Sequence, residues 1–326
     1  LHIGCVCLVW KLISSLLRVH GGVSEKQILY VNFITTLLFA VHPINVEAVA
    51  WISALKVLLY AFFYLLGLLC YLRYIRTSKI FYYVLTIGCF LCSFWGKEQA
   101  VTFPLALLIV DWFTNRNMKN LEVWSEKMSF LIMAFFFGII TVLSQGKGPY
   151  EMIFPLYQRL LFGCFALVEY ITKSLLPVNL NFFYPFPIVL GEEPPLHYYL
   201  YPVVLLFLMG WIIAYRNNRY LVFGVLLFLV NLLFSIHLFN MSRHAIVADR
   251  YMYLSYVGIA FLIANGIWWL RKRLSYFKAA LVFLFFYCFF LSVYTFHYTK
   301  KWENTTMVKK YTKEVLEKRL NGSNHL

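Results

Sequence analysis

Ionisable side chains stand at the ends of apolar stretches in three short groups of this sequence. The groups are His42 with Glu47, Lys97 with Glu98, and Asp249-Arg250-Tyr251. Charged groups at a membrane boundary cost several kcal/mol unless they are paired or hydrated. Three such groups predict one shared hydrated cavity, which could bind an anionic or hydroxylated ligand. Arg250 suits a phosphate best, because its guanidinium group can donate two parallel hydrogen bonds.

Each group also has a plainer interpretation. His42 could simply cap the helix that follows it. Lys97-Glu98 could be a solvated turn, and Asp249 is favourable at a helix start. Glu47 and Lys56 are expected on one helix that begins near Ile44, where Lys56 could line the cavity or extend to the membrane surface. These alternatives stay open at this stage.

The segment 176–187 is rich in proline and aromatic residues, Tyr184 among them. Proline cannot continue a helix and restricts the residue before it, so the segment is predicted to be irregular. It could cover an acceptor or a lipid-headgroup site, or it could be an ordinary connecting loop.

The composition requires a bilayer as the solvent. Hydrophobic residues make up 62% and charged residues 13% of the chain, whereas soluble domains average about 25% charged residues. The net charge of +15 does not indicate nucleic acid, because the basic residues lie between apolar runs and form no single patch. No Walker loop, G-x-S-x-G, H-E-x-x-H or dinucleotide motif occurs. The seven cysteines lie in apolar runs without metal-ligand spacing, which indicates neither a zinc site nor a disulfide framework.

The apolar runs predict helices along the whole chain. They lie near 3–19, 28–41, 54–72, 80–96, 99–113, 129–144, 157–177, 198–215, 220–237, 251–270 and 279–297. Lys and Arg gather in the loops between some of them, which the positive-inside rule makes cytoplasmic. These loops lie at 18–26, 73–79, 116–127, 216–219 and 271–278. Asp111, at the cytoplasmic end of a run, is expected to be a boundary residue.

The basic turn at 216–219 lies on the cytoplasmic side if the run at 157–177 does not cross, the alternative being one missed or one false span elsewhere. Arg159, Glu169 and Lys173 in this run also argue against an ordinary lipid-facing span. We therefore expect 157–177 to be an outer interfacial or re-entrant helix, followed by an outer loop at 178–197. The predicted fold is an all-α integral membrane protein, a polytopic bundle of about ten spanning helices plus this interfacial helix. The core would cover 1–297, and 298–326 would be an extracytoplasmic tail.

Several strings of the sequence, in their order along the chain, resemble a known family. They are His42-Pro43-Ile44-Asn45-Val46-Glu47-Ala48-Val49-Ala50-Trp51-Ile52-Ser53, Gly96-Lys97-Glu98-Gln99-Ala100-Val101-Thr102-Phe103-Pro104, Asp111-Trp112, Pro177-Val178-Asn179-Leu180, Tyr184-Pro185 and Ala248-Asp249-Arg250-Tyr251-Met252-Tyr253-Leu254. Together they resemble the TPR-containing transmembrane O-mannosyltransferases and their bacterial relatives, which belong to the GT-C glycosyltransferase superfamily. The chain opens at Leu1, in the middle of an apolar run and without Met, so we expect a fragment or a truncated product that lacks the family's first span and its TPR repeats.

The resemblance implies a GT-C-like bundle that moves a sugar from a polyprenyl-phosphate-linked donor to a protein or glycan acceptor on the extracytoplasmic face. Arg250 and Lys97, with Lys56 as a lesser candidate, would hold the donor phosphate. The family's catalytic base is an acidic residue expected before Leu1, so the catalytic residues stay unassigned. No cofactor is certain, and a divalent metal is possible. The residues expected to line the pocket are His42, Glu47, Glu98, Asp249, Tyr251 and Tyr184.

Two other functions remain open, a lipid-linked saccharide transporter or flippase and an inactive membrane scaffold. A transporter predicts polar residues in the middle of several spans, whereas here they gather at one end. The expected partners are the lipid bilayer, the lipid-linked donor and the acceptor, and not nucleic acid. The style of the motifs favours a bacterial inner membrane over the endoplasmic reticulum, with the active face extracytoplasmic.

Overall fold

The structure, a computed structural model, describes residues 1–144, 154–236 and 245–323. Over these ranges it is helical without extended strands, as predicted, and its β-type contact is an isolated bridge between Tyr184 and Val247. The α-helices are α1 (His2–His20), α2 (Glu25–Val41), α3 (Val46–Ala50), α4 (Leu55–Thr77), α5 (Ile80–Gly96), α6 (Phe103–Phe113), α7 (Leu121–Ser144), α8 (Leu156–Leu175), α9 (Leu200–Ala214), α10 (Arg219–Leu232), α11 (Met252–Trp269), α12 (Leu274–Lys300) and α13 (Thr305–Ser323). The short 3-10 helices are η1 (Pro43–Asn45), η2 (Ile52–Ala54), η3 (Glu98–Thr102), η4 (Leu196–Tyr199), η5 (Asp249–Tyr251) and η6 (Leu270–Lys272).

Each apolar run predicted as a helix overlaps a helix of the structure. The segment at 176–187 is irregular as predicted, apart from the isolated bridge. Helix α13 was not expected, because its residues are mostly polar and form no long apolar run.

Within the described residues, six helical segments are long and apolar enough to cross a membrane. They are His2–His20, Ile52–Thr77, Leu121–Thr141, Leu196–Ala214, Asp249–Lys272 and Leu274–Lys300. A seventh is added if α2 and the segment Pro43–Ala50, bent by 51°, count as one span, and α5 and α10 are shorter apolar helices. These segments indicate a multi-pass membrane protein, but the prediction of about ten spans is not confirmed.

Large apolar side chains cover the outside of the bundle. Helix α9 has no buried residue, and Phe283, Phe285 and Phe289 on α12 are between 65% and 71% exposed. A soluble protein rarely exposes apolar surface on this scale. Lipid tails are the solvent that makes such surfaces favourable.

The centre of the bundle is built on close helix pairs. Helix α4 packs against α1 and α5, and α11 packs against α2 and α10. Where α10 meets α11, a Cβ atom on Gly258 would lie 2.5 Å from the carbonyl oxygen of Gly224. Only glycine permits this approach, as is usual where membrane helices pack through small residues.

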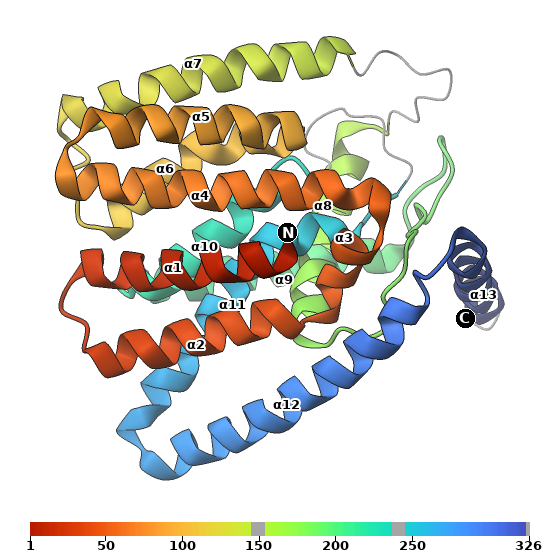
Figure 1. Cartoon of the computed structure of the whole chain (residues 1–326). Helices are drawn as coiled ribbons and strands as arrows, with labels where there is room; N and C mark the ends of the chain where they lie inside the picture. Colours follow the sequence, from red (N-terminus) through yellow and green to blue (C-terminus); the bar gives the residue numbers. More distant parts are fainter. Residues whose placement is uncertain (145–153, 237–244, 324–326) are drawn as a thin grey trace.

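The two ends of the bundle differ (Figure 1). The basic connections α1–α2, α4–α5, α6–α7 and α11–α12 gather at one end, and α3 and α13 lie at the other. We call these the inner end and the outer end, following the orientation predicted from the basic loops.

A bend at the outer end of α2 creates the first of the predicted charged groups. Helix α2 ends at Val41, and the Nδ1 atom of His42 accepts a hydrogen bond from the backbone N–H of Ile44 at 3.2 Å. Proline at the first position of η1 suits a helix start. The chain then turns through α3, breaks at the extended residue Trp51 and enters α4. Glu47 and Lys56 therefore lie on different helices, contrary to the expectation.

Candidate functional site

An ion pair joins the first and third predicted groups, 203 positions apart in the sequence. The side chain of Glu47, in α3, is completely buried, and its Oε1 atom pairs with the guanidinium group of Arg250. Its Oε2 atom accepts a hydrogen bond from the backbone N–H of Arg250 at 2.7 Å. Both carboxylate oxygens are thus held by one residue at the start of α11, so the bend after α2 is fixed against that helix.

The neighbouring carboxylate, that of Asp249, is held by a tyrosine. The Tyr184 hydroxyl donates to Asp249, 3.0 Å from each carboxylate oxygen, and accepts from Lys173 Nζ at 2.8 Å and from the Asn181 backbone N–H at 2.6 Å. Burial first, and the Asp249 charge second, raise the pKa of Tyr184 well above its usual value. The hydroxyl therefore remains a donor at physiological pH, and it joins α8, the 176–187 segment and η5.

Two cations share an aromatic wall beside these carboxylates. The Lys97 side chain is buried, and its Nζ atom lies 4.4 Å from the centre of the Tyr251 ring. The Arg250 Cζ atom lies 5.1 Å from the same ring and 5.5 Å from that of Trp51. Cations over aromatic faces are attracted by the ring quadrupole. Both cations therefore lie near the Tyr251 ring, whose attraction leaves their positive charges in place.

Lys97 reaches this place because of Gly96. Helix α5 ends at Gly96, where an added Cβ would lie 2.7 Å from the backbone nitrogen of Tyr60 on α4. The chain then extends at Lys97 (φ −160°, ψ 141°) before η3 begins. Close packing of α5 on α4 thus positions the turn that carries the lysine.

We call this group of ionisable residues the outer charge cluster. Carboxylates lie on both sides of its cations. At the edge of the cluster, the Glu169 carboxylate lies 3.5 Å from Lys173 Nζ on the same helix. With Glu169 included, the cluster holds three basic and three acidic side chains. The Arg250 side chain is 23% exposed, which leaves a flank open to a ligand. The members of the cluster are Glu47, Lys97, Lys173, Asp249 and Arg250.

Comparison with known proteins adds a relation over part of the chain. The protein O-mannosyl-transferase TMTC2 of Mus musculus is 36% identical over 101 residues, which are 29% of this chain and 12% of the relative. The Homo sapiens protein of the same name is 37% identical over 101 residues, 29% of this chain and 12% of the relative. The Xenopus laevis protein is 31% identical over 123 residues, 35% of this chain and 14% of the relative.

These matches support a relation to the O-mannosyl-transferase family over about a third of the chain. The aligned part spans only about an eighth of the relatives' length. No family model matches the sequence, and no solved structure does. All three relatives come from vertebrates, so they give no support to the bacterial origin favoured by the style of the motifs.

The structure brings together six of the predicted site residues. They are Glu47, Lys97, Tyr184, Asp249, Arg250 and Tyr251.

Three other predicted site residues lie apart from this group. His42 is buried as a helix cap with its ring 4.2 Å from that of Tyr256, which matches its plainer interpretation. Lys56 is exposed and Glu98 is half-buried. Among the described residues, no hydrogen bond or ion pair joins either side chain to the cluster.

Lys173 is the site residue that sequence analysis did not assign. In the sequence, Lys173 was used only as an argument against membrane crossing. In the structure, its side chain is 4% exposed and its Nζ atom lies 4.1 Å from the Tyr184 ring centre. A lysine inside an apolar run was the available signal, because such a charge needs a partner where it is buried. Among the described residues, no group of three or more His, Cys, Asp or Glu side chains is placed to hold a metal ion.

A second buried charge network lies at the inner end. Asp111, expected to be a boundary residue, is completely buried, and it pairs with Lys127 and accepts a hydrogen bond from the Tyr71 hydroxyl at 2.8 Å. Arg116 binds both oxygens of Glu126, at 2.6 and 3.0 Å. Asp111 does lie in the last turn of α6, as a boundary residue would. Its burial was not expected, because its partner Lys127 comes from the next helix, where an isolated lysine in the sequence resembles an interfacial residue.

Proposed function

We propose that this chain is part of a membrane glycosyltransferase that moves a sugar, as a hexosyl group, from a polyprenyl-phosphate-linked donor to a protein or other acceptor. The outer charge cluster carries the proposal, because it gathers cations at the end of the bundle predicted to be extracytoplasmic. The O-mannosyl-transferases that share part of its sequence support the same class of reaction.

The donor phosphate is proposed to bind between Arg250 and Lys97. These cations are held over one tyrosine ring, and the guanidinium group keeps an exposed flank. Fixed cations beside a leaving phosphate stabilise the charge that develops on it in the transition state. In a partly dry site this attraction is stronger than in water.

The buried carboxylates are proposed to orient the cations. Glu47 accepts from Arg250 through both oxygens, and Asp249 accepts from Tyr184. A carboxylate engaged in this way has little capacity to take a proton from an acceptor hydroxyl, which a general base must do. The proposed functions of these two residues are therefore in binding, and the general base is not assigned to either.

Helix α8 is proposed to lie at the outer membrane surface, with 178–197 as an outer loop. The helix is amphipathic: it buries Lys173 and Tyr170 towards the cluster and exposes Leu160 and Leu175. A helix of this kind favours the boundary between headgroups and hydrocarbon. In this position it would hold the loop over the donor phosphate.

Binding of a lipid-linked sugar tests the proposal directly. The purified chain in nanodiscs is titrated with radiolabelled polyprenyl-phosphate mannose, and transfer is followed after a membrane-protein extract is added. Arg250→Lys keeps the positive charge but loses the planar pair of donors. We expect binding about tenfold weaker, since a hydrogen bond to a charged group contributes about 1.5–3 kcal/mol.

Arg273→Lys is the matched control, because Arg273 is an exposed arginine at the inner end. It should bind the donor as the unchanged chain does. Equal affinity of the two variants would remove Arg250 from the phosphate site. Failure of the unchanged chain to bind any polyprenyl-phosphate sugar would refute the glycosyltransferase proposal as a whole.

A further inference from the structure

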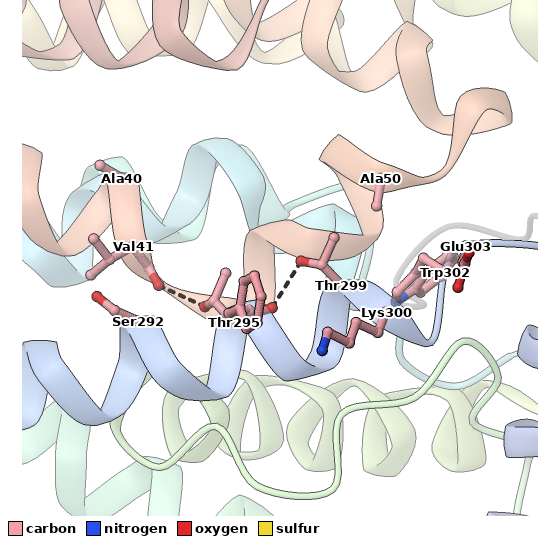
Figure 2. A pocket seen from close by; sticks show the side chains of 10 residues that line it. Ala40, Val41, Ala50, Ser292, Thr295, Thr299, Lys300, Trp302 and Glu303 are labelled. Atoms are coloured by element: carbon pink, nitrogen blue, oxygen red, sulfur yellow. Dashed lines mark hydrogen bonds between the residues drawn. The ribbon is translucent and has the colours of Figure 1, made fainter.

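A groove of about 990 Å³ lies beside the outer end of α2, between the bent segment α2–α3 and helix α12 (Figure 2). Binding sites for small molecules and cofactors generally measure about 300–1,000 Å³. The groove does not include any residue of the outer charge cluster. The Trp302 side chain, which lines it, separates it from Trp51 and so from Arg250.

The hydroxyl groups in the wall of the groove are already used. Thr295 donates to the carbonyl of Val41 at 2.7 Å, and Ser292 and Thr299 donate to carbonyls of α12 at 2.8 Å each. A hydroxyl that donates to a backbone carbonyl has no hydrogen left to donate to a ligand. The remaining wall is mostly apolar, with Ala40 among its residues. The groove therefore favours a ligand that needs no hydrogen bonds along its length.

The groove opens along a helix surface that faces hydrocarbon. Helix α12 is a candidate span with only 17% of its apolar window buried. On it, Phe289 and Phe290 are 65% and 48% exposed. A ligand reaches such a groove sideways from the bilayer, at no cost of moving apolar surface through water.

A cation stands at the outer mouth of the groove. Lys300 is exposed and lies 4.8 Å from the Phe296 ring centre, and none of the ion pairs between described residues includes it. The carboxylate of Glu303 lines the same mouth, while Lys301 follows Lys300 in the sequence. Lysine binds phosphate as a point charge. The mouth therefore suits an anionic headgroup placed on the Lys300 side.

We propose that this groove binds a bilayer lipid with a phosphate headgroup, with one hydrocarbon chain between α2 and α12 and the phosphate at Lys300. The site does not depend on sugar transfer, so it stands or falls separately from the proposed function. A polypeptide is a poorer occupant, because its backbone N–H and C=O groups would have to be buried without partners against this wall.

Photolabelling tests the site. The full chain is placed in phosphatidylcholine nanodiscs that contain a small fraction of phosphatidic acid with a diazirine in its acyl chain. Irradiation followed by peptide mapping should place the label on 40–50 and 288–300. Ser292→Phe fills the groove and should lower this labelling by about tenfold, because a well-filled space rejects added atoms. Ala40→Phe fills it from the opposite wall and should do the same.

Val293→Phe is the matched control, since Val293 is the neighbouring residue, 42% exposed on α12 and absent from the groove. It should leave the labelling unchanged. Equal labelling in Ser292→Phe, Ala40→Phe and Val293→Phe overturns the proposal.

The headgroup is tested with a second probe and a second pair of variants. Lys300→Gln should lower labelling by phosphatidic acid about threefold and leave labelling by the matching phosphatidylcholine unchanged, because one exposed charge contributes modestly. Lys309→Gln, on the exposed face of α13, should change neither. The assigned lipid is refuted if Lys300→Gln leaves labelling by phosphatidic acid unchanged. It is also refuted if a serine-rich soluble peptide displaces the label and unlabelled phosphatidic acid does not.

Discussion

Neutralising Glu47 should weaken the connection between α3 and α11 by an amount that the structure allows us to calculate. Glu47→Gln keeps an acceptor for the backbone N–H of Arg250 but removes the charge that pairs with its guanidinium group. Breaking a fully buried ion pair from one side costs about 3–5 kcal/mol. Because the Arg250 side chain is 23% exposed, water compensates part of the loss, and we expect about 2–3 kcal/mol.

A double-mutant cycle separates the pair from its surroundings. Glu47→Gln, Arg250→Met and the combination are unfolded by adding sodium dodecyl sulfate to mixed micelles, and the helix signal in circular dichroism gives each free energy of unfolding. Residues that form one buried network show coupling energies of about 0.5–3 kcal/mol. We expect a value near the upper end, about 2 kcal/mol, with the double variant more stable than the sum of the two single losses predicts.

The exposed pair Arg18–Glu25 is the internal control. Its atoms are 3.2 Å apart, but the side chains are 57% and 76% exposed. Such surface pairs contribute about 0.2–1 kcal/mol. If the cycle at Glu47 and Arg250 gave no more coupling than this control, the pair would not connect α3 to α11, and the reasoning about the outer charge cluster would be wrong.

Three further changes test other parts of the structure. Asp111→Asn should destabilise the bundle by about 3 kcal/mol, because it removes the fully buried partner of Lys127 and leaves it only the more exposed Glu126. Lys127→Met in addition should recover part of the loss in the same detergent titration. Tyr184→Phe should lower the free energy of unfolding by about 1–3 kcal/mol and lower the thermal midpoint of unfolding. The reason is that the buried groups bonded to its hydroxyl lose their hydrogen-bond partner. Gly258→Ala should destabilise by about 1–3 kcal/mol through overpacking. Gly88→Ala, where nothing lies within 4 Å, should be neutral or slightly stabilising.

Helix positions followed from the sequence because apolar runs in this chain are long and are bounded by charged or polar turns. The number of spans could not be read from the sequence, because the length of an apolar run is not the length of the helix segment that crosses a membrane. The run at 99–113 became the 3-10 segment η3 and the short helix α6. Packing against neighbouring helices can bury such a short element without its reaching across a bilayer, and hydropathy is similar in both cases.

The pairing of charges was beyond sequence reasoning. Glu47 and Arg250 were both candidates, but their contact depends on the bend after α2, and nothing in either local pattern reports the other. Lys173 shows the same limit more strongly, because its partner Tyr184 follows it across a proline-rich turn whose path is set by packing. Residue types identified which side chains need partners, and only the fold identified the partners.

The three charged groups share one structural feature, which fits the proposed binding site at the outer end. Each group lies at a 3-10 turn between an apolar helix and the next: η1 before Glu47, η3 after Lys97, and η5 at Asp249. Non-helical backbone near membrane depth is tolerated only where protein covers it or where it lines a wet cavity. Short 3-10 stretches also cost hydrogen-bond geometry. Three such turns brought together around cations and carboxylates are consistent with the proposed site for an anion at the membrane surface.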